Sequence, residues 1–468
     1  MKIIVVGTGY LGLVHATVCS EYGHKVYGYD IDADKIVAYS TGKSREIKKY
    51  VNEPGLDELI KEYLGKHLFF TTDLASVIEG VEVIFLCLPT PANPDGSSNM
   101  VYYEKAVHQI AGLLAQRKDQ KRVLITNKST VPIGTGRLVE KVMNEHGVKN
   151  FGIASNPEFL AEGTAIAHAR KPSRVVVGCD RKEDFLILRR VYSQFVNHVR
   201  IKYIETTPET AEAIKYISNT ILLMYISFWN GVGARIGEKI ANVRVDDLRR
   251  GVTADDRIST WGSYMSNGAG GNCFGKDIQS LIQQMKHYDV NTDLLDATFA
   301  VNDFQKSYLV DKAVDEAGFD FKNKAVALLG LAFKKQATDI RDASSVKAVD
   351  LLLEHGVRKI KAYDPLAIEE ARREFDPAKK AGYAKIEYAV SAAEAISGTD
   401  ALFISTDWEE FRGVSGTIMN KVTPPYLIID GRRMIPDYEE LVGLGYTYLA
   451  VGSPTMKPET EKAMENVY

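Results

Sequence analysis

The stretch Lys2-Ile3-Ile4-Val5-Val6-Gly7-Thr8-Gly9-Tyr10-Leu11-Gly12 decides the fold of this chain. Its β-branched first half is typical of a buried parallel strand, and the glycines follow it directly. We expect a helix over residues 13–22 and a second strand over residues 25–29 that leads into Asp30. A strand, a glycine loop, a helix, a strand and an acid, in this order, form the βαβ unit that binds a dinucleotide.

Each glycine of this loop has its own task in such a unit. Gly7 permits the tight turn, Gly9 lets a pyrophosphate approach the backbone, and Gly12 allows the helix to pack closely on the strand. The helix N-terminus adds unpaired N–H groups and the positive end of its dipole. Asp30 lies eighteen residues after Gly12, close to the ~20 expected of the acid that accepts the ribose hydroxyls. Because an acid repels a 2′-phosphate, the sequence predicts NAD and not NADP.

The length and charge of the chain limit what it can be. At ~150 residues per domain, 468 residues correspond to two to four domains. A formal net charge of -3 gives no reason to expect nucleic acid or an anionic membrane as a partner. We expect no signal peptide, because the first residues form a strand, and no apolar run approaches the ~20 residues that span a bilayer. The 4 cysteines are scattered, with neither disulfide nor metal-ligand spacing. The sequence predicts a reduced, cytoplasmic enzyme without a metal.

The rest of the chain continues the α/β rhythm, interrupts it and resumes it. A long helical pattern runs from Thr206 to about Ala241, and helices dominate as far as Tyr308. We expect two Rossmann-like, doubly wound α/β domains joined by a central helical domain with a long spine helix. The predicted boundaries are 1–205, 206–310 and 311–468. Since the second α/β domain lacks a full glycine fingerprint, it should bind something other than the dinucleotide.

The segment Gly268-Ala269-Gly270-Gly271-Asn272-Cys273-Phe274-Gly275-Lys276-Asp277 places a thiol among glycines. The glycines let the backbone approach a ligand, and Lys276 would favour the thiolate. If a helix follows, Asp277 shares a face with Cys273. A glycine-rich loop that carries a buried thiol is the alternative interpretation.

Polar residues elsewhere leave two interpretations open. Ser129 and Thr130 follow a predicted strand, where open α/β sheets bind ligands, but they also suit caps of a helix that starts near Gly134. Glu158 and Glu162 follow an Asn-Pro turn into a predicted helix and would share one face of it. Paired carboxylates there suit acid–base chemistry or a solvated surface.

The long helix carries a further pair of polar residues. Lys215 and Asn219 are four residues apart and therefore share one face. A helix of this length fits a spine between two domains or a dimer interface.

Taken together, the motifs resemble one enzyme family. In chain order they are Gly-x-Gly-Tyr-x-Gly from residue 7, Ser-Thr-Val-Pro-x-Gly-Thr from 129, Asn-Pro-Glu-Phe-Leu-Ala-Glu-Gly-Thr-Ala from 156, Lys-x-x-x-Asn from 215, Gly-Gly-x-Cys-Phe-x-Lys-Asp from 270, Phe-Lys from 333 and Asp-Gly-Arg from 430. This order spans nearly the whole chain and resembles the UDP-glucose/GDP-mannose dehydrogenase family. The resemblance implies an NAD-dependent, four-electron oxidation of UDP-glucose to UDP-glucuronate.

The resemblance also implies roles for individual side chains. Cys273 would trap the intermediate aldehyde as a thiohemiacetal, which is oxidised to a thioester and hydrolysed. Lys215 and Asn219 would stabilise oxyanion character. Asp277, Thr130 and Glu158 would position or activate the water. The implied cofactor contacts are Gly7, Gly9, Tyr10, Leu11, Gly12, Asp30, Lys35, Thr90, Ser129, Thr130, Glu162 and Arg341. The implied substrate contacts are Glu158, Phe159, Leu160, Lys215, Asn219, Arg257, Gly270, Lys334 and Arg432.

Some positions depart from the family pattern and leave the sugar open. Pro89 precedes Thr90 where enzymes acting on UDP-glucose often have a smaller residue, and Tyr225 replaces a polar or basic residue. UDP-N-acetylmannosamine and GDP-mannose are the alternative substrates. A two-electron hydroxy-acid dehydrogenase and a non-catalytic nucleotide-sugar sensor are the rival functions. In the family, the residue matching Arg257 reaches into a neighbouring subunit, which predicts a homodimer or a higher assembly.

Overall fold

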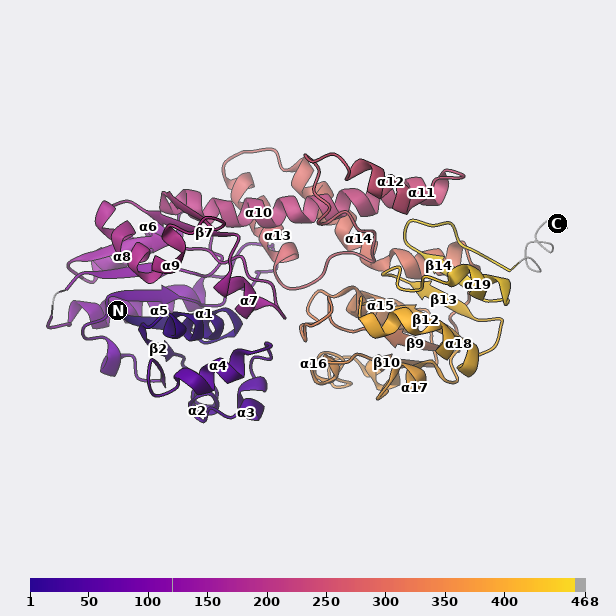
Figure 1. Ribbon diagram of the computed structural model, residues 1–468, viewed down its shortest axis with the longest axis horizontal. Helices are drawn as coiled ribbons and strands as arrows, with labels where there is room; N and C mark the ends of the chain where they lie inside the picture. The colour runs from indigo at the N-terminus through magenta and orange to yellow at the C-terminus, as the bar shows by residue number, and fades with distance from the viewer. Residues whose placement is uncertain (120, 459–468) are drawn as a thin grey trace. The chain divides into compact units, whose positions relative to one another are not determined.

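The computed structural model describes residues 1–119 and 121–458 and separates into two compact units. Unit 1 comprises Met1–Ser218 and Gln279–Asn291, and unit 2 comprises Asn219–Ile278 and the residues from Thr292 onward. The predicted fold class, two Rossmann-like sheets and a central helical region, is confirmed (Figure 1). The three-domain boundaries stay a prediction.

Unit 1 is built on an eight-stranded sheet with the order β3-β2-β1-β4-β5-β6-β7-β8. Neighbouring strands run parallel except β6 and β7, whose antiparallel pairing aligns Ala154 with Cys179. The chain order reverses between β1 and β4, and ligands bind at such switch points in α/β sheets. The strands are β1 (Lys2–Val6), β2 (Lys25–Tyr29), β3 (Leu68–Thr71), β4 (Val83–Leu86), β5 (Val123–Asn127), β6 (Phe151–Ser155), β7 (Arg174–Cys179) and β8 (Lys202–Thr206).

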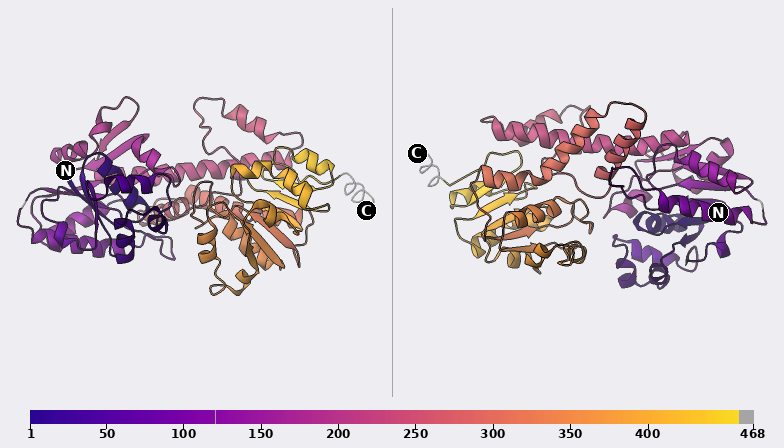
Figure 2. Two further views of the ribbon diagram at one scale, coloured as in Figure 1. Left: turned by 60° about the horizontal axis from the view of Figure 1, so that its bottom comes forward. Right: turned by 180° about the vertical axis from the view of Figure 1, so that it is seen from behind.

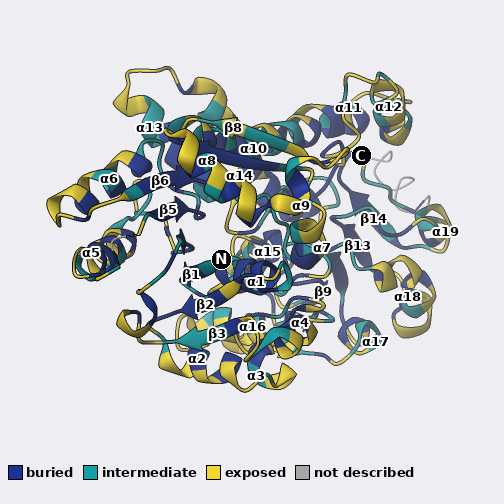
Figure 3. Ribbon diagram, turned by 60° about the vertical axis from the view of Figure 1, so that its left-hand side comes forward, coloured by how far each residue is buried: buried dark blue, intermediate teal, exposed yellow. Residues whose placement is uncertain are grey.

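Helices cover both faces of this sheet because alternate strand residues point to opposite sides. Ile3 and Val5 of β1 belong to the core on one face, and Ile4 and Val6 belong to the core on the other. Figure 3 shows the buried strands between helices whose outer surfaces are exposed. The first face carries α1 (Tyr10–Glu21), α2 (Ala33–Ser40), α3 (Ser44–Lys48), α4 (Leu56–Tyr63), α7 (Ala165–Arg170), α8 (Lys182–Val191) and α9 (Ser193–Val196). The second carries α5 (Val101–Ala115), α6 (Thr135–Glu145) and the short η1 (Ala75–Val77).

The central region of the chain is helical. The predicted long helix is α10 (Pro208–Phe228), which continues through the π-helical turn η2 (Trp229–Gly233) into α11 (Ala234–Lys239). The other helices of this region are α12 (Val245–Val252), α13 (Phe274–His287) and α14 (Asp293–Asp315). The boundary between the two units falls within α10 and within α13.

Unit 2 contains a six-stranded, all-parallel sheet with the order β11-β10-β9-β12-β13-β14. The strands are β9 (Ala325–Leu329), β10 (Lys359–Tyr363), β11 (Ile386–Tyr388), β12 (Ala401–Ile404), β13 (Leu427–Asp430) and β14 (Thr447–Ala450). Helices pack on both sides of this sheet (Figure 2). α14, α15 (Ser344–Glu354) and α16 (Ile368–Glu374) cover one side, and α17 (Ala392–Ile396), α18 (Ser415–Lys421) and α19 (Tyr438–Gly443) cover the other. The short helices η3 (Ala381–Lys385) and η4 (Glu409–Gly413) complete the unit.

Candidate active site

The glycine loop of unit 1 has the geometry of a dinucleotide cradle. Gly7 has a φ of 90°, a left-handed conformation that favours glycine. A Cβ on Gly12 would lie 1.8 Å from the carbonyl oxygen of Gly7, so the loop requires glycine at this position. A Cβ on Gly9 would meet no atom within 4 Å, which leaves open space beside the N-terminus of α1. This loop therefore fits the pyrophosphate of NAD.

Asp30, directly after β2, is buried beside this loop. Its Oδ2 accepts hydrogen bonds from the Thr8 N–H (2.8 Å) and from the Lys35 ammonium (3.1 Å). Burial alone would raise the pKa of Asp30, but N–H groups of Thr8 and Asp32 and the Lys35 charge outweigh it and lower the pKa. Asp30 is thus held as a charged acceptor, as ribose hydroxyls require. Lys35, another predicted cofactor contact, lies beside Asp30, and its role stays a prediction.

Glu53 is a buried carboxylate that the sequence analysis missed. It accepts hydrogen bonds from the Tyr10 hydroxyl, from the Gly163 N–H (2.7 Å) and from the Ala165 N–H (2.6 Å). Burial raises the pKa of Tyr10 above its usual range, and the neighbouring carboxylate adds to the effect. Glu53 therefore joins the start of α1, at Tyr10, to the start of α7. Its only local sign in the sequence is an acid before a Pro-Gly turn.

The polar residues after β5 do not cap α6. The Ser129 hydroxyl donates to the carbonyls of Leu86 (3.2 Å) and Leu88 (2.7 Å), and the Thr90 hydroxyl donates to the carbonyl of Thr130 (2.8 Å). These bonds join the loop after β4 to the loop after β5, at the carboxyl edge of the sheet. The capping interpretation is wrong, because the N-cap residue of α6 is Gly134 and the carboxylate of Glu212 accepts the N–H groups of Gly134 (2.7 Å) and Gly136 (3.1 Å) at its first turn.

The segment after β6 is not the predicted helix. Residues 156–164 form a loop that ends in a turn, and α7 begins only at Ala165. Glu158 and Glu162 therefore do not share a helix face. The physical reason is that the Glu158 carboxylate accepts the N–H of Leu160, while Glu53 accepts the N–H groups at the start of α7. The Glu158 carboxylate thus binds its own backbone in a turn and does not project from a helix.

Glu158 is paired with Lys215 of α10. The Lys215 Nζ lies 2.9 Å from Oε1 of Glu158. Burial alone would raise the pKa of Glu158, but the charge and hydrogen bond of Lys215 outweigh it and lower the pKa. Phe159 lies beside this pair: the Lys215 Nζ is 5.5 Å from the centre of its ring, and the Arg174 guanidinium is 3.8 Å from it. The structure thus brings together three of the predicted substrate residues.

Unit 2 holds the predicted nucleophile at the start of a helix. Cys273 directly precedes α13, and its carbonyl accepts the Asp277 N–H at 2.9 Å. Its side chain is exposed. The buried Asp277 carboxylate accepts hydrogen bonds from the Asn219 amide (2.6 Å) and from the Lys276 ammonium (2.7 Å). Because a helix N-terminus stabilises negative charge, this position favours charge on the sulfur during reaction. The predicted helix after Cys273 is confirmed.

A second group of predicted residues meets around Phe333 in unit 2. The Arg432 guanidinium donates to the carbonyls of Phe333 (3.0 Å) and Ser405 (2.8 Å). A Cβ on Gly270 would lie 3.0 Å from the Cβ of Phe333, and the N–H of Gly271, the next residue, donates to the Arg341 carbonyl (3.1 Å).

Burial lowers the pKa of Arg432, although Asp407 opposes this effect. The Lys334 ammonium lies 5.5 Å from the centre of the Phe333 ring. A partly desolvated guanidinium beside an ammonium suits an anionic group.

Arg257 and Leu11 are not brought into these groups by a described side-chain interaction, whereas the charge of Glu162 acts on Tyr10 and helps to raise its pKa. Arg257 is exposed and forms an ion pair with Asp255 at 2.6 Å. Leu11 packs against the core of unit 1, and Glu162 is half-buried in a turn. Their roles stay predictions. Within residues 1–119 and 121–458, no cluster of three or more His, Cys, Asp or Glu side chains is arranged to hold a metal. No helix of that same part is long and apolar enough to cross a membrane.

Domain models of one known protein family match most of the chain. The NAD-binding domain of the UDP-glucose/GDP-mannose dehydrogenase family matches residues 1–196, its central domain matches residues 209–304 and its UDP-binding domain matches residues 327–437. The UDP-glucose 6-dehydrogenase TuaD of Bacillus subtilis (strain 168) is 34% identical over 459 residues, which cover 97% of this chain and 94% of that protein.

Solved structures of similar proteins cover nearly the same length of the chain. A UDP-glucose dehydrogenase from the archaeon Pyrobaculum islandicum superposes with a TM-score of 0.85 and 29% identity, over 97% of this chain and 98% of the other. A UDP-D-ManNAc dehydrogenase from Pyrococcus horikoshii gives a TM-score of 0.79 and 25% identity, over 97% and 99% of the two chains.

Proposed function

The chain belongs to the UDP-glucose/GDP-mannose dehydrogenase family, and on this premise we propose that it oxidises UDP-glucose to UDP-glucuronate through covalent intermediates on Cys273. It is an NAD-dependent oxidoreductase of that family. The open space at Gly9 and the charged acceptor Asp30 are the features that would hold NAD. When bound, NAD accepts a hydride from the sugar in each of two oxidations.

The exposure of Cys273 carries the proposal. The other three cysteines, Cys19, Cys87 and Cys179, are buried. Burial raises the pKa of Cys19 to about 12 and raises the pKa of the other two still further. A buried thiol with a raised pKa is a poor nucleophile, whereas an exposed thiol at a helix N-terminus suits attack on a carbonyl.

The proposed oxidation proceeds in four steps. Loss of a hydride and a proton converts the C6 alcohol to an aldehyde, and the Cys273 sulfur then forms a bond to the aldehyde carbon while the oxygen gains a proton. Loss of a hydride from that carbon and of the proton leaves a thioester. Attack of water on the thioester carbon breaks the C–S bond and releases the carboxylate, the Cys273 thiol and one proton to solvent.

Other predicted site residues would assist each stage. Lys215 and Asn219 would stabilise negative charge on the sugar oxygen, and Asp277 would hold the attacking water with Thr130 and Glu158. The ion pair of Lys215 with Glu158 and the hydrogen bond of Asn219 to Asp277 fit these roles, because each pre-orients two proposed participants.

The stoichiometry of NADH per sugar tests the proposal. Two NADH per UDP-glucose are expected, with little turnover of UDP-N-acetylmannosamine or GDP-mannose. One NADH per sugar would exclude a thioester intermediate from the mechanism. Turnover of UDP-N-acetylmannosamine alone would identify that sugar nucleotide as the substrate, in line with Pro89-Thr90-Pro91 and with the Pyrococcus horikoshii relative. A Cys273→Ser variant should form no acid, whereas a two-electron dehydrogenase would stay active.

The assembly we propose is a homodimer or a higher homo-oligomer that includes α10. This helix exposes an apolar stripe: Ile217 is 48% exposed, Ile221 52% and Phe228 55%. Contiguous apolar surface of this kind is typical of an interface between subunits. Sedimentation of the protein checks the assembly, and an Ile221→Glu change should shift it toward monomer.

We place this enzyme in the cytoplasm, where cysteine thiols such as its four stay reduced.

A further inference from the structure

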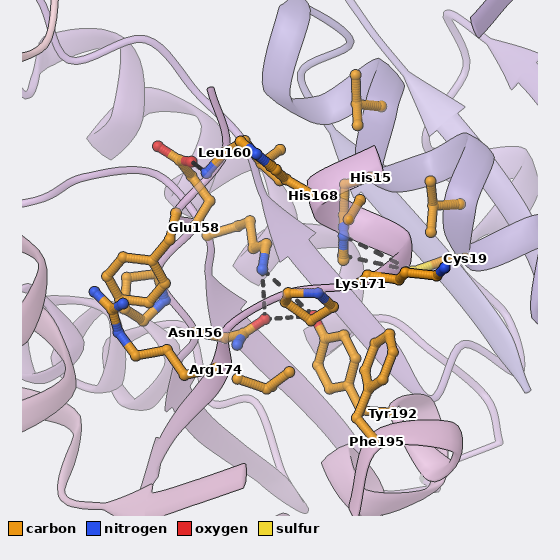
Figure 4. A pocket seen from close by; sticks show the side chains of 18 of the residues that line it. His15, Cys19, Asn156, Glu158, Leu160, His168, Lys171, Arg174, Tyr192 and Phe195 are labelled. Atoms are coloured by element: carbon orange, nitrogen blue, oxygen red, sulfur yellow. Dashed lines mark hydrogen bonds between the residues drawn. The ribbon is translucent and has the colours of Figure 1, made fainter. Parts of the chain in front are cut away.

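Unit 1 contains a cavity of about 330 Å³ to which the proposed reaction assigns no ligand. It is lined by α1, by the segment after β6, by α7 and the segment that follows it, and by the region of α8 and α9 (Figure 4). Its volume lies at the lower end of the ~300–1,000 Å³ typical of small-molecule sites. One wall of the cavity, Glu158–Leu160, consists of predicted substrate contacts. The Lys and Arg side chains of the lining, however, have no role in the proposed reaction.

Lys128 forms the buried cationic part of this cavity. Its Nζ donates to Oδ1 of Asn156 at 2.8 Å and lies 3.4 Å from the Tyr192 hydroxyl, and both partners are neutral. Within the described residues Lys128 forms no ion pair. Burial lowers its pKa to about 8. An ammonium in such surroundings is costly, and a bound anion would offset that cost.

Two more cations line the cavity near the surface. The half-buried Arg174 stacks on Phe159 and donates to the hydroxyls of Ser218 (3.1 Å) and Ser173 (3.4 Å), which are neutral. Lys171 is exposed. Neither forms an ion pair in the described part of the chain. The one carboxylate in the lining is Glu158, and its charge is already paired with Lys215.

The remaining lining is largely apolar. Val14 and Val18 of α1 and Phe195 of α9 are buried side chains of the lining. We propose that this cavity binds a small organic anion, whose acidic group contacts Lys128 and whose apolar part lies on Val14, Val18 and Phe195. The site combines unpaired positive charge with an apolar surface, which together select an amphipathic acid over inorganic anions and over neutral molecules.

Calorimetric titration of the full-length protein with sodium benzoate tests the site, in the absence of NAD and sugar. Benzoate should bind saturably, and benzyl alcohol, which has the same ring without the charge, should bind at least tenfold more weakly. Equal affinity for benzoate and benzyl alcohol would show that the site does not select an anion, and this would overturn the proposal. Absence of benzoate binding would also overturn it. Because the readout is binding, its failure is distinct from failure of the proposed oxidation.

Matched variants locate the binding. Lys128→Met should weaken benzoate binding at least tenfold, whereas Lys141→Met, which removes an exposed lysine of α6, should leave it unchanged. Should Lys128→Met fail to fold, Arg174→Met takes its place and should weaken binding several-fold. Unchanged affinity in the folded variant would overturn the proposal. Competition of UDP-glucose with benzoate would assign benzoate to the substrate site and would also overturn it.

Discussion

The ammonium of Lys215 and the carboxylate of Glu158 lie 2.9 Å apart, although the residues are 57 positions apart in the chain. Both side chains are largely buried, with exposed fractions of 6% and 14%. Each charge compensates the other, and the pKa of Glu158 is lowered although burial opposes this. The pair therefore keeps Glu158 deprotonated at neutral pH and keeps Lys215 in place.

Replacement of Lys215 by Met should make activity more sensitive to acid. Without its partner, the buried Glu158 has a higher pKa, so protonation begins at a higher pH and the acid limb of the kcat/KM profile moves upward. We expect kcat to fall by about 10²-fold or more, since an oxyanion-stabilising charge is also lost. Steady-state rates between pH 4 and 9 measure both effects. Lys141→Met should match the unmodified enzyme, and an unchanged acid limb in Lys215→Met would contradict the role of the pair.

Replacement of Asp277 by Asn should stall the hydrolysis. The carboxylate accepts hydrogen bonds from Asn219 and Lys276, and an amide at this position is no general base. We expect kcat to fall by roughly 10²–10⁴-fold. Intact-protein mass spectrometry after mixing with UDP-glucose and NAD should detect a covalent adduct on Cys273. Asp303→Asn, an exposed change on α14, serves as the control. Full activity without an adduct would remove Asp277 from the mechanism.

Two alanine substitutions in the glycine loop should have different effects. In Gly12→Ala the new Cβ would lie 1.8 Å from the Gly7 carbonyl oxygen, so the loop must shift and stability should fall by about 1–3 kcal/mol. In Gly9→Ala the Cβ meets no protein atom, and the φ of -67° suits alanine. Gly9→Ala should therefore melt as the unmodified protein does, but its KM for NAD should rise. Equal NAD affinity in Gly9→Ala would show that the pyrophosphate does not occupy this space.

Lys128→Met should stabilise the protein at neutral pH. The pKa of Lys128 is about 8 in the folded state, against 10.5 for an unperturbed lysine, a difference worth roughly 3 kcal/mol. Below pH 8 the folded state holds a buried charge and bears this cost in full. Between pH 8 and 10.5 the unfolded chain binds more protons, so the stability of the unmodified protein rises with pH. Urea unfolding should show the advantage of Lys128→Met shrinking from pH 7 to pH 10, and a constant difference would contradict the lowered pKa.

The two interpretations that proved wrong have a common cause. The Asn-Pro turn and the spacing of Glu158 and Glu162 fit a helix locally, and Ser129 and Thr130 fit a helix cap locally. In the structure, Glu158 accepts the N–H of Leu160 and pairs with the distant Lys215, and the carbonyls of Leu86 and Leu88 accept the Ser129 hydroxyl. Side-chain hydrogen bonds to backbone groups compete with a helix or with its cap, and the spacing of the residues in the sequence does not show which bond forms.

The sequence by itself determined the two α/β sheets, the glycine loop with Asp30, the long helix and the helix after Cys273. These features depend on strand and helix periodicity and on glycines within a few residues of one another, so the local pattern is sufficient. Only the tertiary structure decided the Glu158–Lys215 pair, the role of Glu53 at the start of α7 and the cavity at Lys128. These interactions form where segments that are distant in the chain come together and exclude water from their charged groups. No local sequence pattern predicts which segments meet.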